Sequence, residues 1–259
     1  MQLDPKLFEG VVRKERRIAV ITAYYKEPRV MLERCLCSVR AQTIEADHIV
    51  VADGHPQDWI DKSGVRHIRL DQSHGDYGNT PRGIGSLLAI AEDYDAICFL
   101  DADNWLAPDH FQLAIAAAES CTRPVDYVIA KRNMMRPDET IIPVDDEPVE
   151  SHVDTNCFVF FPGSFYMIQK FALVPRELAG IGDRIFYANL RDQKLLSTTL
   201  ATKTVYYHCL WASIYAAIGE TPPDGAKPNI DQAPMKAWLA ALPPERRLAV
   251  SRRTGLDLA

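Results

Sequence analysis

An apolar run that ends in two carboxylates, Ala-Ile-Cys-Phe-Leu-Asp-Ala-Asp at residues 96–103, restricts the fold more than any other stretch of this chain. Such a run is typical of a strand buried on both faces, as in a parallel sheet covered by helices. Open α/β sheets bind ligands beyond the carboxyl ends of their strands, which is where Asp101 and Asp103 fall. Alternate side chains of an extended chain share a face, so both carboxylates could point toward one hard cation, such as Mg²⁺ or Mn²⁺ held against a diphosphate.

Three interpretations of this Asp-x-Asp pair compete. The aspartates could be solvated residues that cap a helix beginning near Pro108. A calcium loop is disfavoured, because Trp105 and Leu106 stand where such a loop needs an oxygen ligand and a glycine. The third interpretation is a metal site for a nucleoside diphosphate. Two aspartates cannot decide among the three, so the rest of the chain has to.

The overall composition excludes several classes of protein. With 259 residues, 47% of them hydrophobic, the chain is long enough for one large or two small globular domains. A net charge of -6 argues against a nucleic-acid-binding protein, which normally carries a basic face. The six cysteines form no Cys-x-x-Cys pair, and no apolar run approaches the ~20 residues of a membrane span. We therefore predict a cytoplasmic protein with reduced thiols, and a peripheral contact with a membrane surface stays open.

Strand and helix patterns alternate along the first half of the chain. A helix is predicted after Pro28 and another at 80–93. Strands are predicted at residues 17–24, 48–53 and 65–70. This alternation indicates βαβ units and a mainly parallel sheet flanked by helices. The loops that follow the strands should converge in space: residues 22–25, 53–55, 75–82 and 101–105.

Four motifs occur in order along the chain: the strand Ile18–Tyr25, Val-Val-Ala-Asp-Gly at 50–54, Asn-Thr-Pro-Arg-Gly at 79–83 and Leu-Asp-Ala-Asp at 100–103. In this order and spacing they resemble glycosyltransferases of GT-A fold, close to family 2, over roughly residues 16–210. The resemblance implies a single GT-A catalytic domain over residues 1–220. Its donor-nucleotide half covers about 16–105 and its acceptor-binding half about 106–220. Residues 221–259 then form a C-terminal loop, a short helix and a basic tail.

In that family, residues after the first two strands hold the nucleoside of the sugar donor. The resemblance implies that Tyr24 stacks on the base and that Asp53 accepts a hydrogen bond from it, although turn statistics alone make Asp53 a turn former. Ala52 departs from the family's usual Asp-Asp-Gly-Ser pattern. Arg82 stands where the family has an arginine near the diphosphate, and its alternative is a solvated helix residue. The predicted donor-binding residues are Thr22, Tyr24, Asp53, Asn79, Arg82, Asp101, Asp103 and Trp211.

The family also places an acidic pair past the metal motif, and the last aspartate of that pair is the general base. Gly182 replaces the first acid here, so the resemblance assigns the base to Asp183, with a helix N-cap as its structural alternative. Asp154 is the second choice as catalytic base. The predicted metal ligands are Asp101, Asp103 and His208. His208 follows a strand at 204–207, and a lone histidine is more often structural than a ligand.

These assignments predict a metal-dependent glycosyltransferase that uses Mn²⁺ or Mg²⁺. It would move a sugar from a nucleoside diphosphate donor, predicted to be UDP-linked, to an acceptor hydroxyl with inversion, as the resemblance implies. The chain has no Gln-x-x-Arg-Trp motif, which favours single transfers over processive synthesis. Two alternatives remain: a non-catalytic nucleotide-sugar-binding module, and a phosphohydrolase that forms an aspartyl-phosphate. The second alternative normally carries Asp-x-Asp after its first strand, whereas three strands precede it here.

Overall fold

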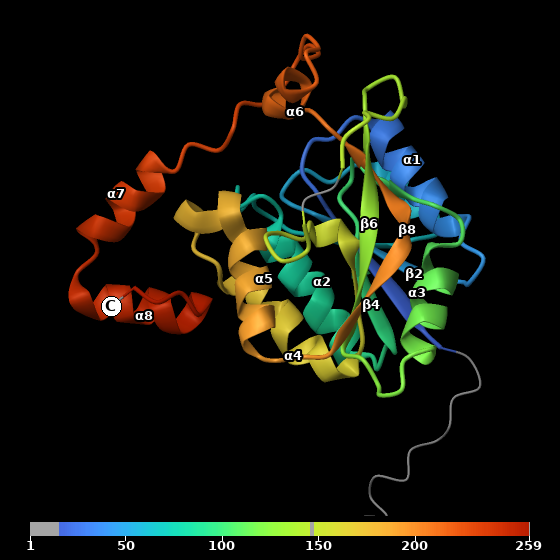
Figure 1. Cartoon of the computed structure of the whole chain (residues 1–259), viewed down its shortest axis with the longest axis horizontal. Helices are drawn as coiled ribbons and strands as arrows, with labels where there is room; N and C mark the ends of the chain where they lie inside the picture. Colours follow the sequence, from blue (N-terminus) through green and yellow to red (C-terminus); the bar gives the residue numbers. More distant parts are fainter. Residues whose placement is uncertain (1–15, 146–147, 259) are drawn as a thin grey trace, which may run out of the picture.

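The computed structural model describes residues 16–145 and 148–258 of the chain. A single eight-stranded sheet, in the order β3-β2-β1-β4-β7-β6-β8-β5, runs through the centre of these residues (Figure 1). The strands are β1 (Ile18–Tyr24), β2 (Asp47–Ala52), β3 (Arg66–Arg69), β4 (Ala96–Phe99), β5 (Trp105–Leu106), β6 (Tyr127–Met135), β7 (Phe158–Phe160) and β8 (Ser197–His208).

The half of the sheet made by β3, β2, β1 and β4 is parallel, as the sequence predicts. In its centre Ile21 of β1 pairs with Ile49 of β2 and with Phe99 of β4. Every residue of β1 and β4 is buried, which explains why both strands are continuous apolar runs. The carboxyl ends of these strands therefore lie along one edge of the sheet, where the polar loops follow.

The other half of the sheet is mixed, because β7 runs antiparallel to both β4 and β6, while β6 and β8 run parallel. The polar residues before β7 do not extend the strand. Asp154 Oδ1 accepts a hydrogen bond from Asn156 N at 3.0 Å and caps one turn of 3₁₀ helix, η3 (Thr155–Cys157). This turn bends the chain so that Asp154 and Asn156 face the carboxyl end of β4, where Asn156 contacts Asp101.

Helices cover both faces of the sheet (Figure 1). α2 (Asn79–Ala91), α4 (Phe165–Ile168) and α5 (Gly182–Asp192) lie on one face, and α1 (Arg29–Arg40) and α3 (His110–Glu119) lie on the other. α2 begins after Gly78, whose φ of 79° few other residues adopt without strain. The Asp76 carboxylate caps this helix from outside, since Oδ2 accepts hydrogen bonds from Thr80 N at 2.9 Å and Thr80 Oγ1 at 2.6 Å.

The C-terminal segment folds back onto the rest of the protein. It contains α6 (Ala212–Ala217), α7 (Ala233–Ala241) and α8 (Pro244–Thr254), and the predicted basic tail is α8 itself. Val250 of α8 is buried with Leu178 of the 3₁₀ helix η6 (Arg176–Ile181) and with Ile185 of α5. Within the described residues, none of the helices combines the length and apolar character needed to cross a bilayer.

Candidate functional site

A cleft of about 940 Å³ opens at the carboxyl edge of β1, β2 and β4. The loops after these strands form one side, and η3, η6 and residues 207–230 form the other. It brings together most of the predicted site residues: Tyr24, Asp53, Asn79, Arg82, Asp101, Asp103, Asp154, Asp183 and Trp211. The predicted residues Thr22 and His208 are not part of its lining.

Asp101 is held from both sides of the cleft. Arg82 Nη2 donates to Asp101 Oδ1 at 2.5 Å, and Asn156 Nδ2 donates to Asp101 Oδ2 at 2.9 Å. Burial lowers the pKa of the Arg82 guanidinium, but the charge and hydrogen bond of Asp101 and the charges of Asp154 and Asp183 together outweigh burial and raise the pKa, so Arg82 stays protonated. Arg82 is therefore not the solvated helix residue of the alternative interpretation. Sequence reasoning missed Asn156, for which the polar start of the predicted strand was the only signal.

Asp103 has a carboxylate that no side chain of the described residues engages by hydrogen bond or ion pair. Arg34 Nη2 donates at 2.8 Å to the backbone carbonyl of Asp103 instead. Burial, followed by the charge of Asp101, raises the pKa of Asp103 to about 7, and the nearby Lys227 acts in the opposite direction. Two carboxylates that repel each other at the end of a cleft are an arrangement that a divalent cation would stabilise.

The raised pKa of Asp103 predicts how stability changes with pH in metal-free protein. Between the unfolded value near 3.8 and the folded value of about 7, the folded state binds the extra proton, so the free energy of unfolding falls as pH rises through this window. The Asp103→Asn variant should lack this loss and be more stable than the wild type above pH 7 by on the order of 3 kcal/mol. Urea unfolding in EDTA at several pH values measures the difference. The exposed Asp224→Asn change is the control, and a gap between Asp103→Asn and wild type that does not grow with pH would contradict the prediction.

Asp154 is buried deeper than Asp101, at the foot of the same cleft. Arg132 Nη1 donates to its Oδ2 at 2.7 Å, and Asn156 Nδ2 donates to its Oδ1 at 2.6 Å. Burial raises the pKa of Asp154, and the charge of Arg132 opposes that rise. The side chain is only 12% exposed. Its hydrogen bonds and burial suit a structural anchor better than a base that must meet an acceptor.

Asp183 lies on the opposite wall, at the first turn of α5. His152 Nε2 contacts its Oδ2 at 2.7 Å, and the Arg184 backbone N–H donates to its Oδ1 at 2.7 Å. Burial raises the pKa of Asp183, but the hydrogen bond and charge of His152, together with the backbone N–H and charge of Arg184, outweigh burial and lower it, so the carboxylate is ionised at neutral pH. The side chain is 30% exposed, more than Asp154. Of the two predicted bases, Asp183 is the more accessible to solvent.

Gly182 explains why the family's first acid is missing at this point. A Cβ on Gly182 would lie 2.7 Å from Asn79 Nδ2, so any side chain there would displace Asn79. Asn79 is itself buried and accepts a hydrogen bond from Arg82 Nη1 at 3.4 Å. The glycine thus lets η6 and the start of α5 approach the N-terminus of α2, and this contact closes the cleft.

Asp53 anchors a loop rather than presenting a free carboxylate. Its Oδ1 accepts hydrogen bonds from His74 N at 3.0 Å and contacts His74 Nδ1 at 2.8 Å. Its Oδ2 accepts longer bonds from Ser73 Oγ and Gly75 N, both at 3.3 Å. These contacts hold the loop that leads to Asp76 against the end of β2. The turn-former interpretation of Asp53 is incomplete as well, because the side chain joins two loops that lie twenty residues apart in sequence.

Two predictions at the end of β1 need correction. Thr22 is fully buried, and its hydroxyl contacts His48 Nε2 at 2.8 Å, so it faces the interior rather than a donor. Tyr24 lines the cleft, but its side chain is 2% exposed and its ring stacks on His67, so it cannot also stack on a base. The next residue, Tyr25, is 41% exposed and lines the cleft, as does Tyr77, which is 70% exposed. The sequence pattern of the strand does not tell which of the two tyrosines faces the cleft. Neighbouring residues of a strand point to opposite faces, so an error of one residue assigns the wrong side chain.

The far end of the cleft is built from the C-terminal segment. Trp211 Nε1 donates to Tyr207 Oη at 2.9 Å, which fixes the indole against the wall. Trp211 also forms a parallel bridge with Lys227, and Lys227 N donates to Leu210 O at 2.6 Å. This pairing places the Lys227 ammonium in the cleft near Asp103. The Pro- and Gly-rich composition of residues 220–228 predicts a mobile loop that would exclude water if it closed over bound donor, but it does not single out Lys227.

His208 does not join the two aspartates in a metal cluster. Its backbone N–H donates to Asn104 Oδ1 at 2.8 Å, and its Nδ1 is buried without a hydrogen-bond partner among the described residues. Burial, followed by the charge of Arg34, lowers its pKa. No group of three or more His, Cys, Asp or Glu side chains in the described ranges is arranged to hold a metal ion. A cation here would therefore need oxygens from a bound ligand besides the chain's own carboxylates.

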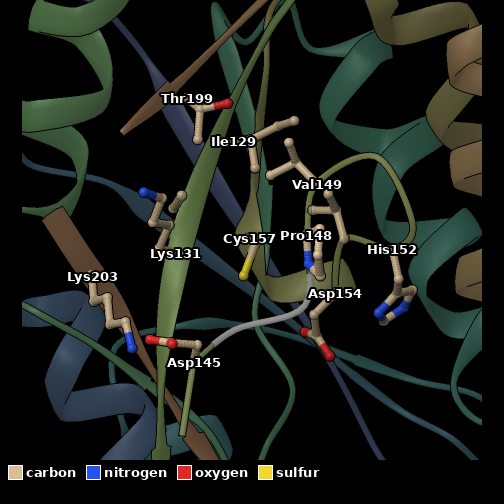
Figure 2. A pocket seen from close by; sticks show the side chains of 12 residues that line it. Ile129, Lys131, Asp145, Pro148, Val149, His152, Asp154, Cys157, Thr199 and Lys203 are labelled. Atoms are coloured by element: carbon tan, nitrogen blue, oxygen red, sulfur yellow. The ribbon is translucent and has the colours of Figure 1, made fainter. Parts of the chain in front are cut away.

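A separate cavity of about 410 Å³ adjoins the cleft at Asp154. Figure 2 shows Asp154 and His152 at one end of this cavity and Lys131 and Lys203 toward the other. Since His152 contacts Asp183 and Asp154 lines both spaces, this cavity reaches the neighbourhood of both predicted bases.

Comparisons with known proteins agree with this geometry. The family model "Glycosyl transferase family 2" matches residues 19–180. The succinoglycan biosynthesis protein ExoW of Rhizobium meliloti (strain 1021) is 33% identical over 115 residues, which are 41% of this chain and 34% of ExoW. The chain thus matches about a third of the length of that relative.

Among solved structures, residues 1–349 of TarS from S. aureus in complex with UDP superpose with a TM-score of 0.58 at 12% identity, covering 93% of this chain and 79% of that one. The TarS complex with UDP-GlcNAc gives a TM-score of 0.56 at 14% identity, with 91% and 64% covered. At this identity the likeness concerns the fold. The family match covers well over half of the chain and contains the Asp101–Asp103 motif, so the chain belongs to glycosyl transferase family 2 and has the GT-A fold.

Proposed function

We propose that the cleft binds a UDP-linked sugar together with a divalent cation, Mn²⁺ or Mg²⁺, and transfers the sugar to an acceptor hydroxyl with inversion. The observation that carries this proposal is the free carboxylate of Asp103, which lies beside the Arg82–Asp101 pair in the cleft that Asp183 also lines. The family membership and the nucleotide-bound TarS neighbours support a nucleotide-sugar donor.

The residues divide into two groups by what their side chains are free to do. Asp103 has an unengaged carboxylate and is the proposed direct metal ligand, while both oxygens of Asp101 already accept hydrogen bonds, so Asp101 shapes the site and adds charge. His208 is not part of this proposal. When bound, a divalent cation would neutralise the negative charge that develops on the diphosphate as it leaves.

Asp183 is the proposed general base. It takes the proton of the acceptor hydroxyl as the acceptor oxygen bonds to the anomeric carbon, and the electron pair of the breaking bond leaves with the diphosphate. The His152 hydrogen bond keeps the carboxylate ionised and oriented. The lowered pKa makes the Asp183 carboxylate a weaker base. Precise positioning of the acceptor hydroxyl must offset this loss.

An aspartyl-phosphate phosphohydrolase would need one of the two motif aspartates as a nucleophile. Both oxygens of Asp101 already accept a hydrogen bond, one from Arg82 and one from Asn156, which makes it a weaker nucleophile. Asp103 lies in the cleft but comes after the fourth strand along the chain. The family match disfavours this alternative as well.

The direct test is calorimetric titration of the full chain with UDP in the presence and absence of Mn²⁺, followed by donor hydrolysis with a panel of nucleotide sugars. Metal-dependent binding of UDP in preference to other nucleoside diphosphates supports the proposal. Binding without any turnover of donor and acceptor would instead support the non-catalytic binding module.

Lys227 provides a further prediction for the donor site. Its ammonium has no acceptor among the described side chains and lies in the cleft near Asp103, so Lys227→Gln should weaken UDP affinity about tenfold. The same change should raise the pH at which Mn²⁺ binds, because the Lys227 charge lowers the pKa of Asp103. Lys236→Gln on α7, an equal change of charge at an exposed position, is the control. Equal UDP affinity in both variants would remove Lys227 from the site.

A further inference from the structure

A second cavity, of about 510 Å³, continues from the donor cleft on the side of the C-terminal helices. Asp76 and Arg176 line both spaces, so the two are neighbours rather than separate sites. The Arg176 guanidinium packs against Gly75, where an added Cβ would lie 3.0 Å from Nη2. One residue thus stands at the junction of the cleft and this cavity.

Two more arginines line this cavity from α8. Arg246 and Arg253 are spaced seven residues apart with Val250 between them, so all three occupy one face of the helix. Val250 is buried against η6 and α5, which fixes that face toward the cavity. The sequence shows only a basic tail, Arg246, Arg247, Arg252 and Arg253. The fold separates them: two face the cavity, while Arg247 donates to the carbonyls of Leu239 and Ala240.

The guanidinium groups of the three cavity arginines form no hydrogen bond or ion pair with any residue in the described ranges. Two carboxylates, Asp76 and Glu177, also line the cavity, but Asp76 Oδ2 is committed to Thr80 and the arginines outnumber the acids. Trp238 and Leu242 of α7 supply an apolar wall beside them. The three guanidinium groups form no ion pair with these acids, so they are available to an anion. A phosphate ester suits them, because its oxygens accept paired hydrogen bonds from guanidinium groups and its organic part can pack against the apolar wall.

We propose that this cavity binds a phosphate or diphosphate ester group carried by the acceptor. The anion site stands on the three arginines alone, whereas its assignment to the acceptor rests on the proposed function. The group could belong to a water-soluble phosphorylated acceptor or to a lipid headgroup, because both present the same chemistry to the guanidinium groups. Held beside Arg176, it would tether an acceptor whose hydroxyl extends into the cleft toward Asp183, which lines the same cleft.

The test compares binding of inorganic diphosphate to the full chain and to three variants by calorimetry in EDTA, which removes the divalent cation that the proposed donor site needs. Arg246→Gln/Arg253→Gln removes the two arginines that line only this cavity, and should weaken diphosphate affinity tenfold or more, because hydrogen bonds between guanidinium groups and phosphate oxygens are charge-assisted. Arg252→Gln is the matched control on the same helix, outside the cavity lining, and should change affinity less than about twofold. Unchanged affinity in the double variant, or equal weakening in the double variant and in Arg252→Gln, would overturn the proposal.

Two controls accompany this comparison. Because all three positions are exposed, the thermal midpoints should stay within a few degrees of the wild type. Arg246→Lys/Arg253→Lys keeps both positive charges and should restore part of the diphosphate affinity.

Flotation with phosphatidylcholine vesicles, with and without phosphatidic acid, distinguishes the two sources. Vesicle binding that requires phosphatidic acid and is lost in the double variant indicates a lipid headgroup, whereas diphosphate binding without vesicle binding indicates a soluble acceptor. Titration with UDP and Mn²⁺ on the same proteins separates this inference from the proposed function. The double variant should bind UDP like the wild type, and a wild type that binds diphosphate through these arginines but no UDP would refute only the donor assignment.

Discussion

The Asp183→Asn variant is expected to transfer sugar at least about a hundredfold more slowly than the wild type while binding UDP with unchanged affinity. Asparagine keeps the size of the side chain and its acceptor for the Arg184 N–H, but it cannot take a proton from the acceptor hydroxyl. The change lies on the wall of the cleft opposite Asp101 and Asp103, so the donor contacts remain. Turnover at saturating donor and acceptor, together with UDP calorimetry, measures both parts.

The matched comparison is Asp154→Asn, the second choice for the base. Asp154→Asn removes the charge from the Arg132–Asp154 ion pair, whose side chains are 5% and 12% exposed, so this variant should be less stable than the wild type. Asp183→Asn should lose less stability than Asp154→Asn in urea unfolding, because the Asp183 side chain is more exposed, 30% against 12%. Retained turnover in Asp183→Asn with a loss in Asp154→Asn beyond its stability change would move the base to Asp154.

The second large effect is expected at the metal site. Asp103→Asn should remove the metal-dependent part of UDP binding, a loss of at least about a hundredfold, because even residues that only support a metal ligand cost 10- to 100-fold when changed. In the wild type, Mn²⁺-dependent affinity should rise with pH until Asp103 is deprotonated near its pKa of about 7. The variant should show neither the affinity nor this pH dependence. Calorimetry with UDP and Mn²⁺ over ~three pH units centred on this pKa measures the metal-dependent affinity and its change with pH.

Two controls accompany this experiment. Asp224→Asn removes an exposed carboxylate elsewhere and should leave metal-dependent binding intact. His208→Ala should leave the Mn²⁺ titration unchanged, because His208 is not part of the cleft lining. Undiminished metal-dependent affinity in Asp103→Asn would show that the cation, if one binds, is held elsewhere.

Local patterns were enough to predict the parallel half of the sheet and its helices. The strand predicted at 17–24 is β1 (Ile18–Tyr24), and the helix predicted at 80–93 is α2 (Asn79–Ala91). These predictions succeed because a strand covered on both faces must be apolar along its whole length. The C-terminal half was harder to predict, since β7 is only three residues long and follows a 3₁₀ turn that Asp154 caps.

The sequence predicted where the candidate site lies better than it predicted what each side chain does there. Carboxyl ends of parallel strands must meet, so Asp53, Arg82 and Asp103 could be brought together from their places in the sequence. Which atoms stay free depends on partners that come from distant segments. His74 donates a hydrogen bond to Asp53, and Asn156 donates one to Asp101. Neither donor belongs to a recognisable motif.

The sequence by itself determined the fold class, the sheet edge that carries the cleft and the family, because these follow from hydrophobic periodicity and from motifs in a fixed order. Only the tertiary structure decided which side chains can act. It buries Thr22 and the ring of Tyr24, leaves Asp103 unengaged, and pairs Asp183 with His152. It also brings Lys227 into the cleft and divides the basic residues of α8 between a cavity and solvent. The physical reason is that burial and hydrogen bonding are set by contacts between residues far apart in the chain, and local patterns contain no record of those contacts.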